Sequence, residues 1–436
     1  MKIGVISLGC AKNLVDTENL LGILNLSGQE IVTKPAEAEA IIINTCGFIE
    51  SAKTEAIDTI LSMADLKEGK LKKLIVMGCL AKRYKPQLEE EMPEVDRFIS
   101  IDEYRDLGNI LSETLGVKIA NQYGKAPRML SGKPWMAYLR IADGCDNRCS
   151  YCAIPLIRGG MRSVPEDELL AEAESLVKKG VKELNLIAQD SSRYGYDLDH
   201  QLHLSSLLRK LDSIEGVKWI RVLYLYPDEI PDDLIETIRD SRHILPYFDI
   251  PVQHGSDHML KAMNRRGSRS LILERAEKIR RELPGAVLRT TLITGFPGET
   301  EEDHALNLSM TEKVQWDHLG VFTYSREEDT PSYELEDDVP AEVKERRRAD
   351  IMELQAGISD ARLAERIGRT EEVLIEKRDP LTEMYIGRSA LHAPDNVDGN
   401  VRFHSEKVHQ AGDFAFVKYT KAAGHTLIGQ EVDGEE

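Results

Sequence analysis

Three cysteines, Cys145, Cys149 and Cys152, lie close together in the stretch DGCDNRCSYCAIP at 143–155. Their C-x-x-x-C-x-x-C spacing puts three thiolates on one short loop, and thiolates bind zinc and iron–sulfur clusters. A structural zinc site takes four ligands, often as two C-x-x-C pairs, so the missing fourth cysteine argues against zinc. A four-iron cluster held by three thiolates leaves one iron open to another ligand. The loop therefore predicts a [4Fe-4S] cluster at which a substrate or cofactor binds.

The other three cysteines form a second set. The apolar runs IGVISLGC, AIIINTCG and KLIVMGCL lead directly to Cys10, Cys46 and Cys79, and a helix-like segment follows each of them. The carboxyl ends of parallel strands share one edge of a sheet, so these distant residues can meet in space. For one such residue alone, a buried structural cysteine is the alternative, because Cys is often buried. Three equivalent positions favour a shared ligand set and a second cluster.

The elements that would position these cysteines form an α/β chain. Residues 1–124 are expected to be an open parallel α/β sheet domain, followed by a linker at 125–134. From 135 to 339 apolar runs alternate with amphipathic helices, which predicts a partial (β/α) barrel of about six strands with catalysis at the strands' carboxyl ends. The six strand-like runs are MAYLRIA, ELNLIA, WIRVLYL, FDIPV, AVLRTTLI and LGVFTY. A solvated helical connector is expected at 340–369.

The last segment, 370–436, contains five short strand-like runs separated by Gly, Pro and Asp, which predicts a small OB-like β-barrel. Residues 371–436 contain seven Lys or Arg and thirteen Asp or Glu, a net charge of −6. Such an acidic barrel suits a basic protein partner better than RNA. We expect it to be separable, so that its deletion weakens substrate capture and spares the chemistry.

Composition excludes several classes of protein. The net charge of −19 in 436 residues disfavours a general nucleic-acid binder, and no direct DNA contact is expected. The longest apolar runs are far shorter than the roughly 20 residues of a membrane helix, so no membrane association is expected. Six cysteines are too few for a disulfide scaffold and point to metal or redox chemistry in a reducing cytoplasm.

The cysteine loop resembles that of the radical S-adenosylmethionine enzymes. Further along the chain, the segments LNLIAQDSSRYG, YLYPDEI, YFDIPVQHGSD, MNRRG, LRTTLITGFPGET and VFTYSREEDTPS occur in order. Together with SLGCAKNLVDTE and INTCGFIESAK, they resemble the methylthiotransferase family over essentially the whole chain. LGCAKNLVDTE and RVLYLYPDE are similar to the branch that modifies an aspartate of small-subunit ribosomal protein 12, rather than the branch that modifies tRNA adenosine. The resemblance implies that the terminal barrel is a TRAM domain.

The resemblance also implies cofactors and site residues. Cys145, Cys149 and Cys152 would hold the cluster that binds S-adenosylmethionine, and Cys10, Cys46 and Cys79 an auxiliary [4Fe-4S] cluster. Five further residues are expected to contact S-adenosylmethionine: Tyr151, Gln189, Asp190, Gly295 and Gly298. A turn or helix cap is the alternative for Gln189 and Asp190, and Gly-rich turns are common in loops. Arg193 and Arg289 are candidates for binding a carboxylate, or ordinary surface charges.

The implied reaction uses two S-adenosylmethionine molecules. One would methylate a sulfide on the auxiliary cluster, and the other would be split by an electron from a reduced donor protein to give a 5′-deoxyadenosyl radical. That radical would abstract hydrogen from the β-carbon of the target aspartate, on a free ribosomal protein or an assembling ribosome, before methylthio transfer. The alternatives are a tRNA adenosine methylthiotransferase and a non-catalytic iron–sulfur electron carrier or sensor. A carrier would be expected to close its clusters with four ligands.

Overall fold

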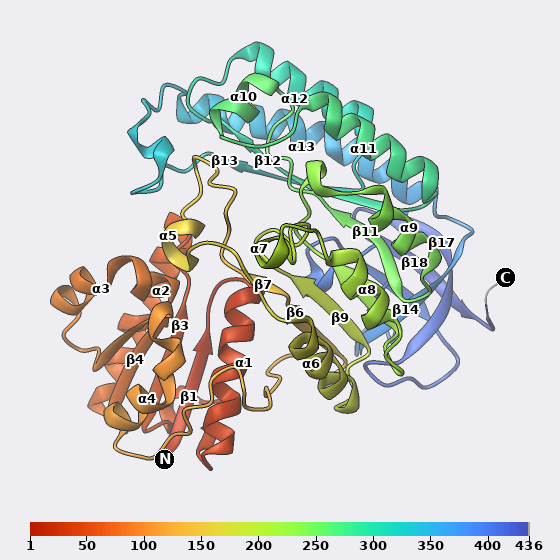
Figure 1. Cartoon of the computed structure of the whole chain (residues 1–436). Coiled ribbons are helices and arrows are strands. Elements are labelled where there is room, and N and C mark those ends of the chain that lie inside the picture. Colours follow the sequence, from red (N-terminus) through yellow and green to blue (C-terminus); the bar gives the residue numbers. More distant parts are fainter. Residues whose placement is uncertain (435–436) are drawn as a thin grey trace. The chain divides into compact units, whose positions relative to one another are not determined.

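The computed structural model describes residues 1–434, which divide into two compact units (Figure 1). The first unit consists of Met1–Lys179, Ile187–Gln189 and Ser325–Glu334, and therefore contains all six cysteines. The second consists of Gly180–Leu186, Asp190–Tyr324 and the chain from Leu335 onward. No helix among the described residues is long and apolar enough to span a bilayer.

The first unit is built on a five-stranded parallel sheet in the order β2-β1-β3-β4-β5. Its strands are β1 (Lys2–Ser7), β2 (Glu30–Val32), β3 (Ala40–Thr45), β4 (Lys73–Gly78) and β5 (Arg97–Ser100), and its helices are α1 (Ala11–Leu26), α2 (Glu50–Ala64), α3 (Cys79–Glu91) and α4 (Leu107–Leu115). The continuous apolar run of β3 is typical of a central parallel strand buried on both faces. Ile42 packs with α1 and α4 on one face, and Ile41 and Ile43 pack with α2 and α3 on the other. The expected open parallel sheet is confirmed.

The cysteine loop of the first unit lies between β6 (Met136–Arg140) and α6 (Glu166–Lys178). A short antiparallel pair, β7 (Ala142–Asp143) and β8 (Arg162–Ser163), closes this loop, and α5 (Ile154–Arg158) lies inside it. Past β6, Ile141 N donates to Ile187 O at 3.0 Å, at the end of β9. The loop therefore begins beside the carboxyl end of a second strand.

The second unit contains the parallel strands β9 to β13 of a six-stranded sheet whose order is β13-β12-β11-β10-β9-β6. These strands are β9 (Glu183–Ile187), β10 (Trp219–Val222), β11 (Ile244–Asp249), β12 (Val287–Thr294) and β13 (His318–Thr323). The helices between them are α7 (Tyr196–Asp199), α8 (Leu204–Asp212), α9 (Asp232–Asp240), α10 (Asp257–Ala262), α11 (Arg269–Glu282) and α12 (Glu301–Val314). The expected partial barrel of about six strands is confirmed.

Helix α13 (Ala341–Ala364) occupies the segment expected to be a solvated connector, and the expectation of solvation is wrong. Ile351 and Ile358 are buried, and Arg347 is also buried and donates to the backbone oxygen of Glu299 at 3.0 Å. The side chains of Arg347 and Glu299 also form an ion pair of 3.2 Å. Because an apolar stripe and a buried arginine both face inward, α13 packs into the second unit as part of its core.

The terminal segment forms a closed five-stranded barrel, as expected. Its strands are β14 (Thr370–Arg378), β15 (Tyr385–Arg388), β16 (Asn400–His404), β17 (Phe414–Ala423) and β18 (Thr426–Val432). All pairings are antiparallel except β16 with β18. Short 3-10 turns complete the described chain: η1 (Pro35–Glu37), η2 (Asp65–Glu68), η3 (Ile101–Asp106), η4 (Pro227–Glu229), η5 (Pro331–Glu334) and η6 (Pro394–Asn396).

The expectation that this terminal barrel is separable is also corrected by the structure. Arg388 of the terminal barrel forms a two-armed ion pair with Glu183 of β9, and both side chains are almost fully buried. Trp219 Nε1 of β10 donates to Glu372 Oε2 at 3.1 Å. Removing one partner of a buried ion pair strongly destabilises a protein, because the other partner is left as an uncompensated buried charge. The terminal barrel is therefore an integral part of the second unit.

Candidate active site

The first cysteine set lies at the carboxyl edge of the N-terminal sheet. Cys10 follows β1, Cys46 directly follows β3, and Cys79 begins α3 directly after β4. The strands end nearly level, because the register pairs the last residue of β1 with Asn44 and the last of β3 with Gly78. The strand order reverses between β1 and β3, and open α/β sheets bind ligands at such switch points. The fold thus places all three cysteines at the edge where open α/β sheets generally bind ligands.

The three thiols of this set are electrostatically coupled. Burial raises the pKa of Cys46, and the neighbouring Cys10 raises it further. Burial raises the pKa of Cys79 to about 12, with the charge of Arg158 opposing the rise and Cys46 and Cys10 adding to it. Cys10 itself is exposed. Within residues 1–434 no cysteine forms a disulfide, so all six remain thiols.

Two glycines let the backbone approach this set closely. Gly9 has a φ of +89°, and a Cβ there would lie 2.7 Å from Cys46 Cβ and 3.3 Å from its sulfur. A Cβ on Gly47 would lie 2.8 Å from the Cα of Leu80, the residue after Cys79. A side chain at either position would therefore push apart the loops that carry the cysteines.

Asn13, in the first turn of α1, ties the three cysteine-bearing loops together. Its Nδ2 donates to Leu8 O at 3.1 Å and to Thr45 O at 3.0 Å, the residues that precede the first two cysteines of the set. Its Oδ1 lies 3.5 Å from the sulfur of Cys79. Asn13 is almost fully buried, so its side chain fixes the geometry of this edge.

The second cysteine set lines a hollow of about 330 Å³ in the same unit. Besides Cys145, Cys149 and Cys152, the hollow is lined by Asp146, Arg148, Pro155, Leu156, Gly160, Asp329 and Pro331. Cys145 N donates to Gly159 O, and Cys152 N donates to Cys149 O, both at 3.0 Å. A Cβ on Gly144 would lie only 2.1 Å from Gly160 O. The loop is therefore folded tightly around its three thiols.

Both sets have the donor chemistry of an iron–sulfur site. Among residues 1–434, no three His, Cys, Asp or Glu side chains are arranged as ligands of a single metal ion. Thiolates that hold a four-iron cluster bind different irons, and their sulfur atoms therefore stand further apart than the ligands of one zinc ion. Three thiols around a hollow, and three more at a sheet edge with no room for side chains on the adjoining glycines, fit such clusters.

Two of the residues expected to contact S-adenosylmethionine belong to this unit. Tyr151 is half-buried on the cysteine loop between Cys149 and Cys152. Gln189 Nε2 donates to Asp143 Oδ1 at 3.3 Å. The other amide atom, Gln189 Oε1, is buried and has no hydrogen-bond partner among the described residues, as an acceptor reserved for a ligand would be.

The other three expected contacts belong to the second unit. Asp190 is buried and accepts a hydrogen bond from Ser192, which is also what a turn would provide. Gly295 and Gly298 have φ values of +73° and +81°, so the Gly-Phe-Pro-Gly turn needs glycine at both positions. Gly298 N donates to Asp338 Oδ1 at 2.7 Å. Their contact with S-adenosylmethionine stays a prediction.

Arg289 is not a rim residue. It lies near the amino end of β12, where its ion pairs join Asp249 at 3.4 Å and Asp398 of the terminal barrel at 3.3 Å. Arg193 has an ion pair of 3.5 Å with Glu229 and lies over the ring of Tyr196. Because Arg289 is already paired with two aspartates, it is not a candidate for binding a substrate carboxylate.

The sequence interpretation missed a buried polar layer next to both cysteine sets. Asp16 of α1 and Arg158 of α5 are almost fully buried, and an ion pair of 2.8 Å joins them. Asp143 also pairs with Arg158, at 3.1 Å. The available signal was an arginine at the end of the otherwise apolar run AIPLI directly after the cysteine loop.

Comparison with known proteins defines the class first. Residues 2–100 match the "Uncharacterized protein family UPF0004", residues 139–308 the "Radical SAM superfamily" and residues 367–432 the "TRAM domain". The solved structures of two radical S-adenosylmethionine proteins share the fold. TsrM from Kitasatospora setae has a TM-score of 0.56 at 13% identity over 76% of each chain, and OxsB has 0.53 at 13% identity over 81% of this chain and 56% of that one. Fold and cysteine loop together define a radical S-adenosylmethionine enzyme.

Relatives that match nearly the whole chain identify the family more closely than the separate domain matches do. Proteins named "Ribosomal protein uS12 methylthiotransferase RimO" from Acetivibrio thermocellus and Pelobacter propionicus are 44% and 46% identical. The alignments cover 99% and 98% of this chain and 98% and 97% of those proteins. The chain therefore belongs to the RimO family of radical S-adenosylmethionine methylthiotransferases.

Proposed function

We propose that the chain methylthiolates the β-carbon of an aspartate in small-subunit ribosomal protein 12. The reaction would use two molecules of S-adenosylmethionine, one as methyl donor and one as the radical source, with sulfur from a [4Fe-4S] cluster held by Cys10, Cys46 and Cys79. A second [4Fe-4S] cluster would be held by Cys145, Cys149 and Cys152. The observation that carries the proposal is the presence of two separate three-cysteine sets within one compact unit.

When bound, the clusters and S-adenosylmethionine would supply the radical and the methylthio group. A β-hydrogen beside an ionised carboxylate is too weakly acidic for a side-chain base to remove, so the protein contributes placement and exclusion of water instead. Asn13 and Gly9 would fix the geometry of the first cysteine set. Gln189 would present its buried Oε1 to S-adenosylmethionine.

The proposed partners are the ribosomal protein, free or in an assembling small subunit, and a reduced electron-donor protein in the cytoplasm. The names of the relatives support the first of these. A tRNA substrate is the alternative, but the described terminal barrel is acidic, and negative charge repels a polyphosphate.

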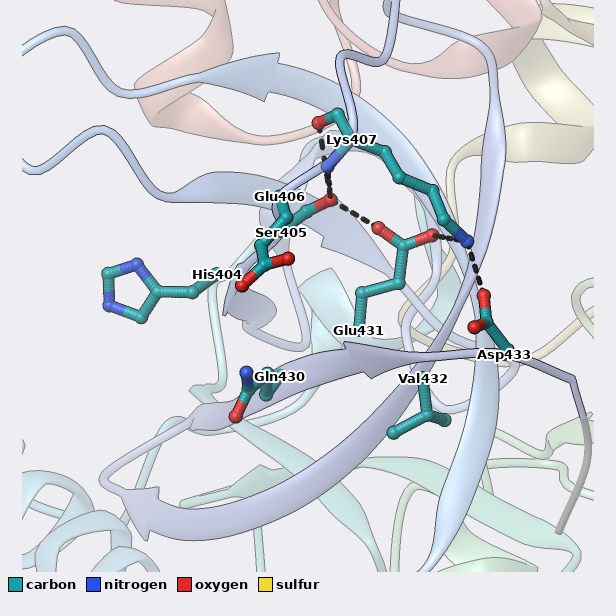
Figure 2. Close-up of a pocket in the computed structure, with 8 residues that line it drawn as sticks. All are labelled: His404, Ser405, Glu406, Lys407, Gln430, Glu431, Val432 and Asp433. Carbon is teal, nitrogen blue, oxygen red and sulfur yellow. Dashed lines mark hydrogen bonds and ion pairs between the residues drawn. The ribbon is translucent and has the colours of Figure 1, made fainter.

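A hollow of about 410 Å³ on the terminal barrel is a candidate surface for binding a basic segment of the ribosomal protein. Figure 2 shows Glu431 between Ser405 and Lys407, with Lys407 also reaching Asp433. Lys407 Nζ lies 3.4 Å from Glu431 Oε1 and 2.6 Å from Asp433 Oδ1. Glu406 is a third carboxylate in the lining, so acidic side chains outnumber the lysine. The surface is complementary to a basic segment.

Reversing charge at this hollow should weaken substrate capture. We expect the double variant Glu406→Lys/Asp433→Lys to bind the ribosomal protein about tenfold more weakly at low salt, a loss of about 1.4 kcal/mol. Cleavage of S-adenosylmethionine without substrate should be unchanged. Binding is measured by titration at two salt concentrations, because screening should shrink the difference.

The matched control is Glu55→Lys/Asp58→Lys, which makes the same charge change on exposed positions of α2. Equal weakening by both double variants would mean that only the total charge matters, and would contradict docking at the terminal barrel.

A second prediction concerns Gly9. The variant Gly9→Ala should lose the cluster of the first set and fall from about eight irons per chain to about four, because its Cβ would collide with Cys46. The control is Gly28→Ala, which has a similar φ of +68° but no atom within 4 Å of the added Cβ. Iron analysis after anaerobic reconstitution measures both. An iron content that falls equally in both variants would attribute the loss to backbone strain alone.

The proposed function itself is tested by the intact mass of the small-subunit ribosomal proteins from cells with and without this enzyme. We expect one protein to gain the mass of a methylthio group in place of one hydrogen, on an aspartate, only when the enzyme is present. Comparing the free ribosomal protein with the same protein in assembled subunits shows whether modification occurs before or during assembly. A gain on tRNA instead would establish the alternative.

A further inference from the structure

The buried side chain of Arg158 contacts the first cysteine set, whereas its backbone belongs to the loop of the second. Arg158 is the last residue of α5, the helix that follows Cys152 by two residues, so its backbone belongs to the second set's loop. Its guanidinium points to the first set: Nη2 lies 3.9 Å from the sulfur of Cys79 and 2.9 Å from Asn13 Oδ1. Only 4% of Arg158 is exposed, which leaves these contacts shielded from water.

Two carboxylates, that of the buried Asp16 and that of the partly buried Asp143, lie next to the Arg158 guanidinium. Its Nη2 lies 2.8 Å from Asp16 Oδ2, and its Nη1 lies 3.1 Å from Asp143 Oδ1. Asp16 also pairs with Arg140 and accepts a hydrogen bond from Tyr123 Oη at 2.9 Å. Arg140 and Arg158 thus face Asp16 and Asp143, and the more exposed Arg162 lies 3.9 Å from Asp143 at the edge of the layer. A thiolate at Cys79 adds one negative charge, and Arg158 is the cation in contact with its sulfur.

Hydrogen bonds and charges next to a ligand sulfur set the reduction potential of an iron–sulfur cluster and orient the ligand. A positive charge that is screened from water favours the more negative, reduced state of the cluster. The Arg158 guanidinium is buried, so its positive charge is shielded from water. Its Nη2 is also directed at the Cys79 sulfur and at the Asn13 oxygen beside it, so it can both orient this ligand and influence the potential.

We propose that Arg158 is a positioning residue of the first cysteine set: it orients the Cys79 thiolate and raises the reduction potential of the cluster that this set holds. The inference rests on the proposed function, since it requires a cluster at that set. The step measured is a one-electron reduction of the cluster by dithionite, with no bond made or broken. Because Arg158 ends the helix of the second set, the same side chain ties the two sites together.

The test uses the full-length chain with Cys145, Cys149 and Cys152 replaced by Ala, so that only the first set can hold a cluster. After anaerobic reconstitution, each chain is titrated with dithionite and the reduced cluster is followed by electron paramagnetic resonance. The variants are Arg158→Gln, Arg158→Lys and Asp16→Asn. The control is Arg162→Gln, which removes the same charge from a side chain that is 55% exposed and pairs with Asp143 only at 3.9 Å.

We expect Arg158→Gln to raise the ratio of oxidised to reduced cluster at least tenfold at a fixed potential, a shift of about 59 mV to more negative values. Arg158→Lys should restore most of the change, and Asp16→Asn should shift the potential in the opposite direction. Arg162→Gln should match the parent chain. Opposite shifts for the two charges distinguish an electrostatic role from a loosened fold, which would move both variants the same way.

Shifts of the same sign for Arg158→Gln and Asp16→Asn, or an Arg158→Gln potential equal to the parent's, would overturn the inference. If Arg158→Gln does not fold, the Asp16→Asn shift decides: a positive shift supports the inference, and no shift or a negative one overturns it. A full enzyme with about four irons per chain overturns the proposed function and this inference together. About eight irons with unshifted potentials overturns this inference alone.

Discussion

Replacing Cys145, Cys149 or Cys152 with Ala should abolish cleavage of S-adenosylmethionine by the dithionite-reduced enzyme. Only two thiolates of this loop would remain to hold the cluster, so S-adenosylmethionine would lose the iron at which it would bind and be reduced. The expected loss is complete within the detection limit. The product 5′-deoxyadenosine is measured by chromatography after anaerobic incubation. Cleavage at an appreciable fraction of the parent rate would show that this loop does not bind the cofactor.

Replacing Cys10, Cys46 or Cys79 with Ala should give a different phenotype. These residues lie at the sheet edge and not on the cysteine loop, so some cleavage of S-adenosylmethionine should remain while methylthio formation stops. Each cysteine set therefore serves as the control for the other. Methylthiolated product from any of these variants would contradict the role of the first set as the sulfur site.

Removing the terminal barrel should destabilise the whole second unit, and the point variant Arg388→Ala should lower the free energy of unfolding by about 3–5 kcal/mol. The reason is the buried pair of Arg388 with Glu183, whose carboxylate would keep only the more distant Arg221, at 3.6 Å. Urea unfolding followed by circular dichroism measures the change. A chain that ends before Thr370 should lose cleavage of S-adenosylmethionine as well as substrate capture.

The matched control is Lys421→Ala, an exposed position on β17 of the same terminal barrel, which should change stability by less than about 0.5 kcal/mol. If Arg388→Ala and Lys421→Ala unfold alike, the terminal barrel is separable after all.

Much of the fold follows from local sequence patterns. The buried runs ending at Thr45 and Gly78 predict central parallel strands, and the structure has them in a five-stranded parallel sheet. The alternation from Met136 to Thr323 predicts the partial barrel, and five short runs predict the closed terminal barrel. These predictions hold because burial on one or two faces imposes a period that the sequence displays.

Other features depend on long-range pairing that no local pattern records. Arg347 is one of three consecutive arginines and looks solvated, yet its partner Glu299 lies 48 residues earlier. Arg388 pairs with a glutamate 205 residues away, which is why the terminal barrel looked separable. Arg158 and Asp16, 142 residues apart, form the layer beside the cysteines in the same way. A buried charge can be recognised only when its partner's position is known.

The most direct test of the account is the iron and acid-labile sulfide content of anaerobically reconstituted protein, measured together with the two triple cysteine variants. Two three-thiolate sites predict about eight irons per chain, falling to about four when either set is replaced by Ala. Zinc in place of iron, or about four irons in the parent chain, would contradict it.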